Sequence, residues 1–440
     1  MQEEKKQSIV SILLRFSLPL ILSGVLQQLY NWADAFIVGN VNGELALAAI
    51  GATSTVINLY IMAITGFTLG LCILFAQKFG AGQTEGIPKI LATFVLLLGA
   101  VFLVLAGAGI GLTGPLLRLL HTTADTVQMA ESYLRIVLLG VPFLAVYNVY
   151  AAALRGIGDS RAPFLAIVLS SAVNVALDLL FVARLRWGVA GAAAATVAAQ
   201  AVMTVFLIAY SVKKHRTLRF RPGRKALDRW SLVQGVRLGV PPMIQSSVSA
   251  FGSLILQNFM NGFGTQTVAA ITTAYRVDTM VLLPIINLGS GISTIVAQNY
   301  GAGEKARTKK VFAVGAVMMA VVSLLLTALV IQTGGHLIAM FGVGPEATEI
   351  GWRFFRRIAS FYLVFGMATA MRGYLEGLGD VLYSSAAGIL SLLSRIILSY
   401  ALAALFGNMI IAYAEAFSWV LLLLLYLARM VWKNKKTRPT

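Results

Sequence analysis

The chain alternates long apolar runs with short polar segments, and this pattern predicts membrane-spanning helices. A run of about 20 apolar residues is long enough to cross a bilayer as a helix. Each half of the chain contains six such runs, with approximate bounds of 12–38, 46–75, 91–115, 133–154, 163–183 and 188–212, and then 238–260, 267–298, 311–333, 354–375, 382–405 and 409–431. Because an even number of spans returns the chain to its starting side, we expect an all-α polytopic membrane protein with twelve transmembrane helices in two parallel six-helix repeats.

The two halves also share short motifs at a constant separation of 221 residues. AQKFGAG at 76–82 recurs as AQNYGAG at 297–303, and RGIGD at 155–159 recurs as EGLGD at 376–380. Two apolar bundles related in this way are typical of secondary transporters, in which substrate binds near the midplane at the repeat interface. We therefore predict a central cleft between the repeats. RGIGD and EGLGD resemble phosphate-binding loops only weakly, and we interpret both as tight turns.

A basic segment between the repeats predicts the domain boundaries. Positive charge is densest at 213–237, which we interpret as a basic cytoplasmic linker. Residues 1–212 then form an N-terminal six-helix bundle, and residues 238–440 form a C-terminal one. A linker close to anionic lipid headgroups explains this charge better than nucleic-acid binding does.

Composition and charge agree with a membrane protein. The chain is 58% hydrophobic and only 12% charged, with a mean hydropathy of +0.82, whereas a soluble domain has about 25% charged residues. Most of the 35 Lys and Arg residues fall on one side of the predicted spans. The positive-inside rule then places both termini in the cytoplasm. A single cysteine and the absence of any N-x-S/T sequon fit a bacterial inner membrane.

Motifs for enzymatic chemistry are missing from the sequence. It contains no G-x-x-x-x-G-K-S/T loop, no H-E-x-x-H motif and no Cys/His cluster. The three histidines fall in loops or at the ends of spans. We therefore expect neither an enzyme nor a bound cofactor, and we predict transport driven by an ion gradient.

A polar stripe on the first predicted span is one candidate site. Gln27, Tyr30, Asn31 and Asp34 follow the spacing of a single helix face. A carboxylate at the centre of a membrane helix costs about 2.5–3.5 kcal/mol on insertion scales, so it is retained where it faces a cavity or a hydrogen-bonded packing seam. We expect this face to line the interior of the first half.

Asn174 and Asp178 form a second candidate site, on the fifth span. Their i, i+4 spacing stacks an amide and a carboxyl group on one helix face. Such a pair suits either oxygen ligation of Na+ or a protonatable carboxyl held by an amide. Thr196, on the next span, can add a hydroxyl oxygen. The fourth span adds further polar groups at Tyr133, Tyr147 and Asn148.

The second half lacks an equivalent of this site. At the offset of 221 residues, Asn174 corresponds to Arg395, and Asp178 corresponds to Ser399. Asp34 falls near an apolar position, Leu256, once a one-residue gap is allowed. This asymmetry predicts that the ion-coupling site lies in the first half.

Asp278, Arg276, Glu415 and Arg395, within the second-half spans, remain without an assigned chemical role. Asp278 lies two residues from Arg276, and we interpret it as part of a local ion pair or a helix-end contact. Glu415 lies on the span next to Arg395, so these two side chains can pair.

The combination of motifs resembles the multidrug and toxic compound extrusion (MATE) family over essentially the whole chain. The resemblance rests on the repeat, on the stretch from Gln27 through Asp34 to Gly39, and on Asn174-x-x-x-Asp178. It also rests on the GAG turns after spans two and eight and on the paired motifs RGIGD and EGLGD.

This resemblance implies an outward pump that exchanges H+ or Na+ for organic, often cationic, compounds. It implies inside termini, a monomer, and a cation site in the first half made by Asp34, Asn174, Asp178 and Thr196. Gln27, Tyr133 and Asn148 match polar positions of the family's cavity, and Pro19 matches a proline at a helix bend. One branch of the family uses acids in spans seven and ten, which this sequence lacks.

Three alternatives to multidrug export remain open from sequence. A dedicated exporter of one metabolite would share every feature above. A lipid-linked glycan flippase would need a more basic cavity to hold a pyrophosphate. A membrane scaffold without transport activity would not need the buried acids Asp34 and Asp178.

Overall fold

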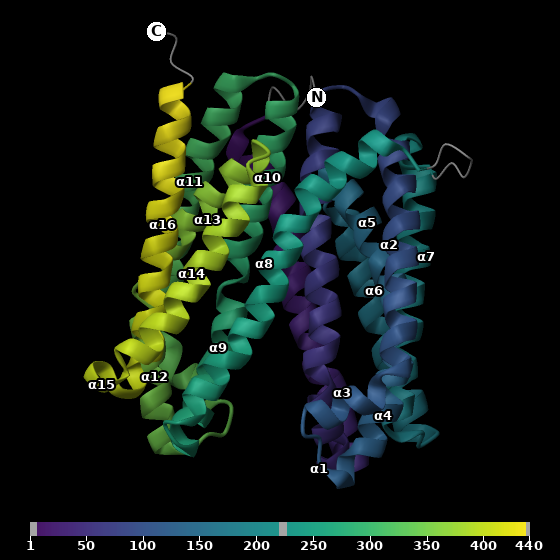
Figure 1. Ribbon diagram of the computed structural model, residues 1–440, viewed down its shortest axis with the longest axis vertical. Coiled ribbons are helices and arrows are strands. Elements are labelled where there is room, and N and C mark those ends of the chain that lie inside the picture. The colour runs from purple at the N-terminus through teal and green to yellow at the C-terminus, as the bar shows by residue number, and fades with distance from the viewer. Residues whose placement is uncertain (1–6, 220–226, 437–440) are drawn as a thin grey trace. The chain divides into compact units, whose positions relative to one another are not determined.

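The computed structural model describes residues 7–219 and 227–436 (Figure 1). Throughout these residues the chain forms helices and no β-strand. Seven helices are long and apolar enough to cross a membrane, and three bent helix pairs meet the same criteria when each pair is taken as one span. The predicted all-α, multi-pass architecture is therefore confirmed. Part of the predicted linker, residues 220–226, lies outside the described residues.

The chain divides into two compact units. We call Leu22–Met243 the first-half unit, and Met1–Ile21 together with Ile244–Thr440 the second-half unit. The division does not test the predicted domain boundaries, which stay a prediction. It does show that the start of the chain packs with the second half.

The first-half unit contains most of the long helix α1 (Ile9–Gly80), which covers the first two predicted spans and leaves helical geometry at Gly43. After it come η2 (Thr84–Gly86), α2 (Ile87–Gly111), α3 (Thr113–Leu119), α4 (Ala124–Leu138), α5 (Val141–Gly156), α6 (Arg161–Asp178), the π-helical segment η3 (Leu179–Arg184), α7 (Gly188–Lys214) and η4 (Arg216–Leu218).

The second-half unit contains the later part of α8 (Arg229–Asn261) and the remaining helices. In chain order these are α9 (Thr265–Val281), α10 (Leu283–Gly301), α11 (Lys305–Ala339), α12 (Pro345–Ala359), α13 (Tyr362–Gly377), α14 (Val381–Ala401), α15 (Ala403–Phe406), η5 (Gly407–Met409) and α16 (Ile410–Lys436). The start of α1 and the end of α16 lie at the same end of this unit (Figure 1).

The units exchange the first parts of two equivalent helices. Leu13 and Phe16 of α1 belong to the apolar core of the second-half unit. Conversely, a Cβ added at Gly235 of α8 would come within 2.0 Å of the Phe94 side chain in the first-half unit. Each exchanged segment ends just after a proline inside the helix, Pro19 in α1 and Pro241 in α8. Proline removes a backbone hydrogen bond and loosens the helix at that point.

Prolines also explain two of the three bent spans. Pro142 and Pro284 are the second residues of α5 and α10, and a proline at the start of a helix cannot continue the hydrogen bonding of the helix before it. The α4–α5 and α9–α10 pairs bend by 41° and 40° at these points. The α12–α13 pair bends by 47° at Ser360 and Phe361, where no proline is present.

The repeated glycine motifs form matching turns, as predicted. Gly158 and Gly379 have φ angles of 95° and 85°, a region that glycine adopts without strain. The amides of Asp159 and Asp380 close these turns on carbonyl oxygens five residues earlier, at 2.8 and 2.9 Å. Equal backbone geometry at equivalent positions supports a structural repeat.

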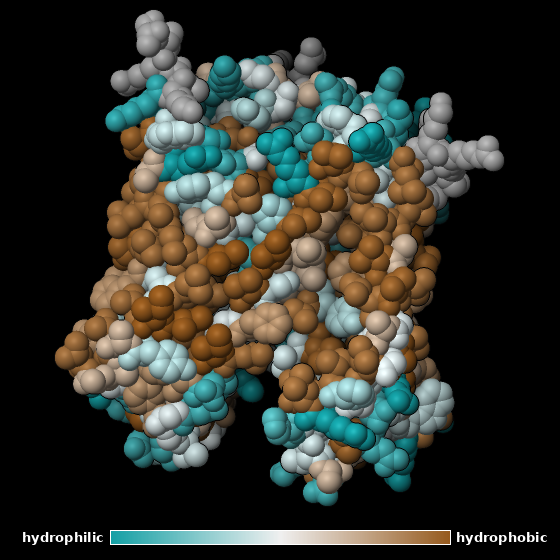
Figure 2. Space-filling view, viewed as in Figure 1, coloured by the Kyte–Doolittle hydropathy of each residue, from teal (hydrophilic) through white to brown (hydrophobic). Residues whose placement is uncertain are grey.

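Hydrophobic side chains dominate the middle of each unit, and polar side chains gather at both ends (Figure 2). This distribution places an apolar belt where lipid would surround each bundle. Exposed leucines such as Leu103 and Leu324, which are 62% and 54% exposed, belong to this belt.

Candidate cation site

Asn174 and Asp178 lie on one face of α6 and are completely buried. With the amide nitrogen of Asn174 facing Asp178, it donates a hydrogen bond to Oδ2 at 2.7 Å. The amide oxygen of Asn174 then accepts from the backbone N–H of Thr196 on α7 at 3.3 Å. The structure therefore brings these three predicted site residues together.

Asp34 of α1 joins this group from the other side. Its carboxyl group lies next to the Asp178 carboxyl, and Tyr30, one turn earlier, lies next to Thr196. The site therefore holds two adjacent acids rather than one.

Tyr133 completes the set from α4, where its side chain is 6% exposed. Its hydroxyl-bearing ring lies close to Tyr30, Asp34 and Asp178. We call these six residues the first-half cluster: Tyr30, Asp34, Tyr133, Asn174, Asp178 and Thr196. All six belong to the first-half unit.

The first-half cluster has unused acceptors and no positive partner among the described residues. One oxygen of Asp34 and one of Asp178, Oδ1 in each case, are buried without a hydrogen bond. Neither acid has a lysine or arginine close enough to affect it. Such a site can bind a proton or a small cation, because buried charge is stable only when paired.

The helix geometry changes immediately after Asp178. Residues Leu179–Arg184 form a π-helix rather than an α-helix. Short π segments inside helices occur often at functional sites, because they interrupt the regular i→i+4 ladder. No feature of the sequence reasoning predicted this segment.

The other predicted cavity residues are placed differently. Gln27 and Asn31 of α1 are exposed. Asn148 and Tyr147 of α5 are buried at 8% and 7% exposure. Asn148 donates its side-chain amide to the carbonyl of Leu144 at 2.8 Å, within its own helix.

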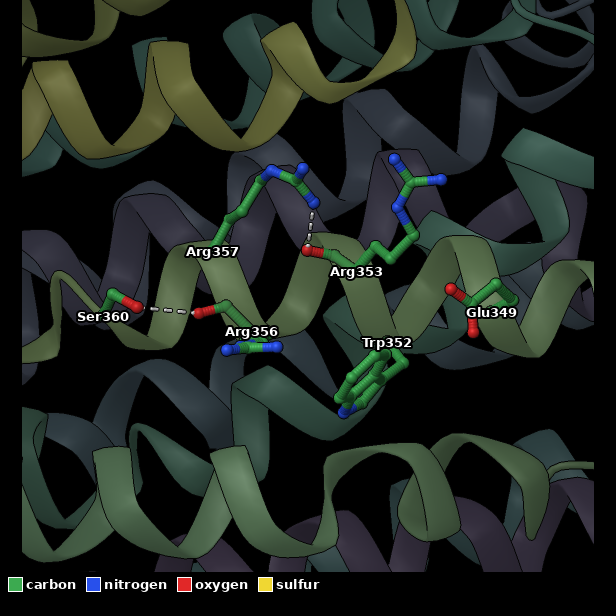
Figure 3. A pocket seen from close by; sticks show the side chains of 6 residues that line it. All are labelled: Glu349, Trp352, Arg353, Arg356, Arg357 and Ser360. Atoms are coloured by element: carbon green, nitrogen blue, oxygen red, sulfur yellow. Dashed lines mark hydrogen bonds between the residues drawn. The ribbon is translucent and has the colours of Figure 1, made fainter.

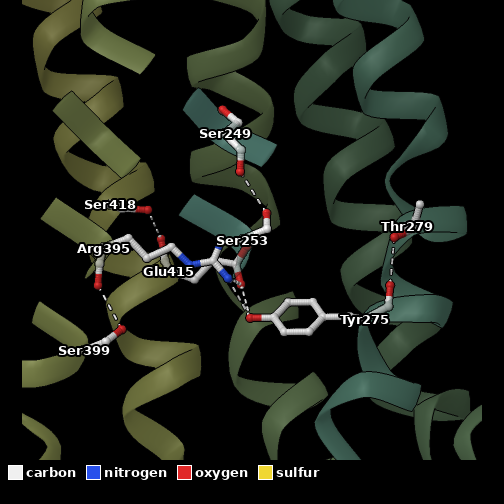
Figure 4. Close-up of polar contacts among 8 residues, drawn as sticks. All are labelled: Ser249, Ser253, Tyr275, Thr279, Arg395, Ser399, Glu415 and Ser418. Atoms are coloured by element: carbon white, nitrogen blue, oxygen red, sulfur yellow. Dashed lines mark hydrogen bonds and ion pairs between the residues drawn. The ribbon is translucent and has the colours of Figure 1, made fainter. Parts of the chain in front are cut away.

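The charged residues of the second half form a separate cluster (Figure 4). Arg395 of α14 donates from Nη2 to Glu415 Oε2 of α16 at 2.9 Å and to the Tyr275 hydroxyl of α9 at 2.7 Å. The Tyr275 hydroxyl in turn donates to the same Glu415 oxygen at 2.8 Å. The expected pairing of Glu415 with Arg395 is confirmed.

Asp278 belongs to the same region but has a different partner from the one expected. Its carboxylate accepts a hydrogen bond from Tyr362, the first residue of α13. Arg276 is only two residues away in sequence, but residues i and i+2 of a helix do not face each other. We call Tyr275, Asp278, Tyr362, Arg395 and Glu415 the second-half cluster.

Sequence reasoning missed one intramembrane basic residue, Arg372 of α13. Its Nε atom donates to Glu376 at 2.6 Å, and Nη2 donates to Gln245 of α8 at 3.3 Å. The i, i+4 spacing of Arg372 and Glu376 was visible in the sequence and is the signal that would have found it.

Two aspartates outside the spans, Asp159 and Asp380, occupy the repeated turns. Burial opposes ionisation of Asp159, but hydrogen bonds from His215 and from the backbone of Ala162 outweigh it and lower its pKa. Burial likewise opposes ionisation of Asp380. Its hydrogen bonds with Arg429 and Lys433 nevertheless bring its pKa below the ordinary value.

One open pocket of about 430 Å³ lies along α12 in the second-half unit (Figure 3). Its lining residues all come from this region: Glu349, Trp352, Arg353, Arg356, Arg357 and Ser360. Arg357 is fixed by donating from Nε to the Tyr413 hydroxyl at 3.1 Å and from Nη1 to the Arg353 carbonyl at 2.9 Å. The pocket therefore combines three guanidinium groups with one carboxylate.

No group of three or more His, Cys, Asp or Glu side chains positioned to hold a metal ion occurs in the described ranges. The first-half cluster instead offers two carboxyl groups, an amide and hydroxyl groups. Na+ and H+ both bind to oxygen ligands of this kind, so the ligand set does not choose between them.

Comparison with known proteins matches the chain to one protein family over most of its length. A family model described as MatE matches residues 19–180 and, separately, residues 241–401. The chain is 28% identical over 403 residues to the "Probable multidrug resistance protein YpnP" of Bacillus subtilis, covering 91% of this chain and 89% of that protein. It is 29% identical over 451 residues to the "Probable multidrug resistance protein YoeA" of the same species, covering 99% and 96%.

A solved structure has the same fold. It is described as the outward-facing conformation of a multidrug resistance MATE family transporter of the MOP superfamily. It superposes with a TM-score of 0.91 at 21% identity, over 98% of both chains. The two separate matches to the family model coincide with the internal repeat seen in the sequence.

Proposed function

The chain belongs to the MATE family of membrane transporters, and we propose that it exports organic, often cationic, compounds in exchange for H+ or Na+. The observation that carries the proposal is the first-half cluster. It places two acids together, with unused oxygens and without a positive partner among the described residues. A charge imbalance of this kind favours binding of a mobile cation.

The proposed mechanism is competition for Asp34 and Asp178. A proton or Na+ entering from outside neutralises these carboxyl groups and removes the anionic partner of a bound organic cation. The substrate then leaves outward. Release of the ion to the cytoplasm restores the negative charge, which attracts the next substrate. Exchange follows because the coupling ion and the organic cation bind the same carboxylates, Asp34 and Asp178, at different times.

The membrane potential provides part of the driving force. Each positive charge that moves inward contributes about 2.3 kcal/mol per 100 mV. A proton gradient or Na+ gradient adds to this. No nucleotide hydrolysis is required, in agreement with the missing phosphate-binding loop.

Location and assembly belong to the same proposal. The positive-inside distribution favours a bacterial inner membrane with both termini in the cytoplasm. We further propose that the protein acts as a monomer, with membrane lipids as its surroundings and no nucleic-acid partner.

Gradient-driven efflux of ethidium from proteoliposomes tests the proposal. Purified wild type is compared with Asp34→Asn and Asp178→Asn, which keep the side-chain size and remove the charge. We expect efflux by the wild type under a pH or Na+ gradient and loss of efflux in both variants. The gradient that works identifies the coupling ion.

Two results would contradict multidrug antiport. One is failure of the wild type with ethidium and with other organic cations under both gradients. The other is undiminished coupled efflux by both variants. Transport of a single metabolite, but of no other organic cation tested, would instead identify a dedicated exporter with the same coupling.

One observation favours a second candidate, a flippase for phosphate-bearing lipid-linked substrates. The pocket on α12 contains Arg353, Arg356 and Arg357, and guanidinium groups bind phosphate in two-pronged geometry. Transfer of a fluorescent polyprenyl-pyrophosphate lipid across vesicle membranes tests it. Loss of this transfer in an Arg353→Gln/Arg356→Gln/Arg357→Gln variant would favour the flippase, and absence of transfer by the wild type would reject it.

A further inference from the structure

Arg395 stands at the second-half counterpart of the cation site. The repeat offset equates Asn174 with Arg395, so both project from equivalent helices, α6 and α14. In the same alignment Thr196 of α7 falls two residues from the counterpart of Glu415 on α16. The two polar clusters therefore share one pair of equivalent helices, α6 and α7 in the first half and α14 and α16 in the second, whereas Asp34 and Asp278 lie at positions that are not equivalent.

The contents of the two clusters differ by one fixed charge. The first-half cluster has two acids, Asp34 and Asp178, and no basic side chain among the described residues. The second-half cluster also has two acids, Glu415 and Asp278, but it contains the guanidinium of Arg395. A tyrosine hydroxyl accompanies the acids in both cases.

Arg395 is held tightly within this environment. Its side chain is 20% exposed, and its partner Glu415 is 9% exposed. One guanidinium nitrogen, Nη2, binds both Glu415 and the Tyr275 hydroxyl, whereas the buried Nε atom has no hydrogen-bond partner (Figure 4). The guanidinium is therefore paired in charge, but its hydrogen bonds are incomplete. We interpret it as a buried cation whose charge matters more than a full set of hydrogen bonds.

We propose that Arg395 is a tethered cation, which fills in the second half the position that the exchangeable ion takes in the first. The second half is thereby held permanently in the cation-loaded condition, and the transporter exchanges ions through one half only. This inference rests on the proposed cation exchange at the first-half cluster. Arg395 exerts this effect through its hydrogen bonds to Glu415 and Tyr275.

Removing the tether converts the second-half cluster into a site for a free cation. Arg395→Ala leaves the acceptor groups of Glu415 and Tyr275 around a cavity shaped for a guanidinium. Methylguanidinium matches the missing end of the side chain in charge and hydrogen-bonding geometry. The chemical class of ligand is therefore a small planar organic cation.

Thermal unfolding of the purified protein in detergent tests this step without any transport assay. We expect methylguanidinium chloride at millimolar concentrations to raise the unfolding midpoint of Arg395→Ala by several degrees, in a saturable way. Choline chloride at the same ionic strength serves as the salt control. The matched control variant Arg395→Ala/Glu415→Gln, which lacks the anionic acceptor, should not respond, and neither should the wild type.

A second measurement counts cations. The number of protons or Na+ ions bound per molecule is compared for the wild type, Arg395→Ala and Asp178→Asn. We expect one additional ion in Arg395→Ala and one fewer in Asp178→Asn. Arg395→Lys, which keeps a tethered charge, should bind as many ions as the wild type.

Two results would overturn the tethered-cation proposal. One is a folded Arg395→Ala protein that binds no additional cation and does not respond to methylguanidinium. The other is failure to obtain folded Arg395→Ala even when methylguanidinium is present throughout purification, while Arg395→Lys folds normally. Unchanged ion binding by Asp178→Asn would instead contradict the proposed function, so the two failures are distinguishable.

Discussion

The clusters around Asp178 and Arg395 share one pair of equivalent helices in the repeat, but their buried charges are compensated in different ways. In the second half, the acid Glu415 is paired with Arg395 at 2.9 Å. In the first half, Asp34 and Asp178 have only each other, Asn174 and neutral hydroxyl groups. A permanent positive partner, such as Arg395, keeps the charge of its cluster fixed. Where no such partner is present, an exchangeable cation can bind to the acids instead.

The backbone around these clusters has diverged much less than their side chains. The glycine turns at Gly158 and Gly379 keep nearly equal φ angles, and the aspartates that follow them close the same hydrogen bonds. Positive φ angles and close helix contacts admit few residue types. Buried acids need only a compensating positive charge. This charge can come from Arg395 in the second half and from an exchangeable cation in the first.

The largest expected effect on stability comes from breaking the ion pair between Arg395 and Glu415. Glu415→Ala leaves the guanidinium of Arg395 buried without its anion, and a broken buried pair costs about 3–5 kcal/mol of stability. Arg395→Met/Glu415→Ala removes both charges and should recover most of this loss, because apolar replacement of a whole pair is close to neutral. The free energy of unfolding in detergent is the measurement. Equal destabilisation of the single and double variants would show that the charges of Arg395 and Glu415 do not stabilise the fold by neutralising each other.

Removing the charge of Asp178 should affect transport more than stability. Asp178→Asn eliminates one charged interaction, which is worth about 1.5–3 kcal/mol. A loss of about 2.7 kcal/mol corresponds to a 100-fold decrease. We therefore expect gradient-driven efflux to fall about 100-fold, with little change in the unfolding midpoint.

The matched control is Ser399→Ala, at the second-half position equivalent to Asp178. The Ser399 hydroxyl donates to the carbonyl of Arg395 at 2.8 Å, within its own helix. Its removal should leave efflux within about twofold of the wild type, since an i→i−4 bond of this kind adds little. Similar losses of efflux in both variants would remove the distinction between an exchanging half and a static half.

The sequence was sufficient to predict an all-α, multi-pass architecture, the repeated turns and part of the first-half cluster. Apolar runs and the i, i+4 spacing of Asn174 and Asp178 are local signals, and local spacing fixes which side chains share a helix face. The approach of Asp34 to Asp178 depends on packing between helices far apart in sequence. The family resemblance, not periodicity, linked these two residues in advance.

Other features left no local signal. The hydrogen bond from Tyr362 to Asp278 joins residues 84 positions apart, whereas proximity in sequence had favoured Arg276. The exchange of the first parts of α1 and α8 between units was also not visible. Apolar side chains give the same pattern whichever bundle they pack against, so hydropathy cannot specify the partner.

The shared backbone can be tested at a repeated glycine pair. A Cβ at Gly156 would lie 2.5 Å from the Phe75 Cβ, and a Cβ at Gly377 would lie 2.5 Å from a methyl group of Val296. We expect Gly156→Ala and Gly377→Ala each to destabilise the protein by about 1–3 kcal/mol, through overpacking against the neighbouring helix. Thermal unfolding of the two variants measures this directly.

Gly107→Ala is the control for helix propensity. Nothing lies within 4 Å of a Cβ built at this position of α2. Alanine is favoured over glycine inside a helix by about 1 kcal/mol, so this variant should be neutral or slightly stabilised. A large difference between Gly156→Ala and Gly377→Ala would mean that the two halves do not share equally tight packing.

The smallest expected effect comes from neutralising the two turn aspartates. Asp380 binds Arg429 through both carboxylate oxygens, at 2.7 and 3.0 Å, and Lys433 at 3.0 Å. Asp159 instead faces His215 at 2.9 Å. Asp380 therefore has two cationic side-chain partners, whereas Asp159 is held by a histidine ring nitrogen and by the backbone N–H of Ala162.

The lowered pKa values of both aspartates determine how the stability of the fold changes at acid pH. A carboxylate with a lowered pKa stabilises the fold above its unfolded value of about 3.9, and this contribution is lost as pH falls through the folded pKa. Asp159→Asn and Asp380→Asn should therefore each cost about 1 kcal/mol at pH 5.5, and this cost should disappear below pH ~3. The unfolding midpoints of both variants and of the wild type, measured from pH 5.5 down to below pH ~3, test this. A cost that stayed the same at both ends of this pH range would show that the charges of these carboxylates stabilise neither turn.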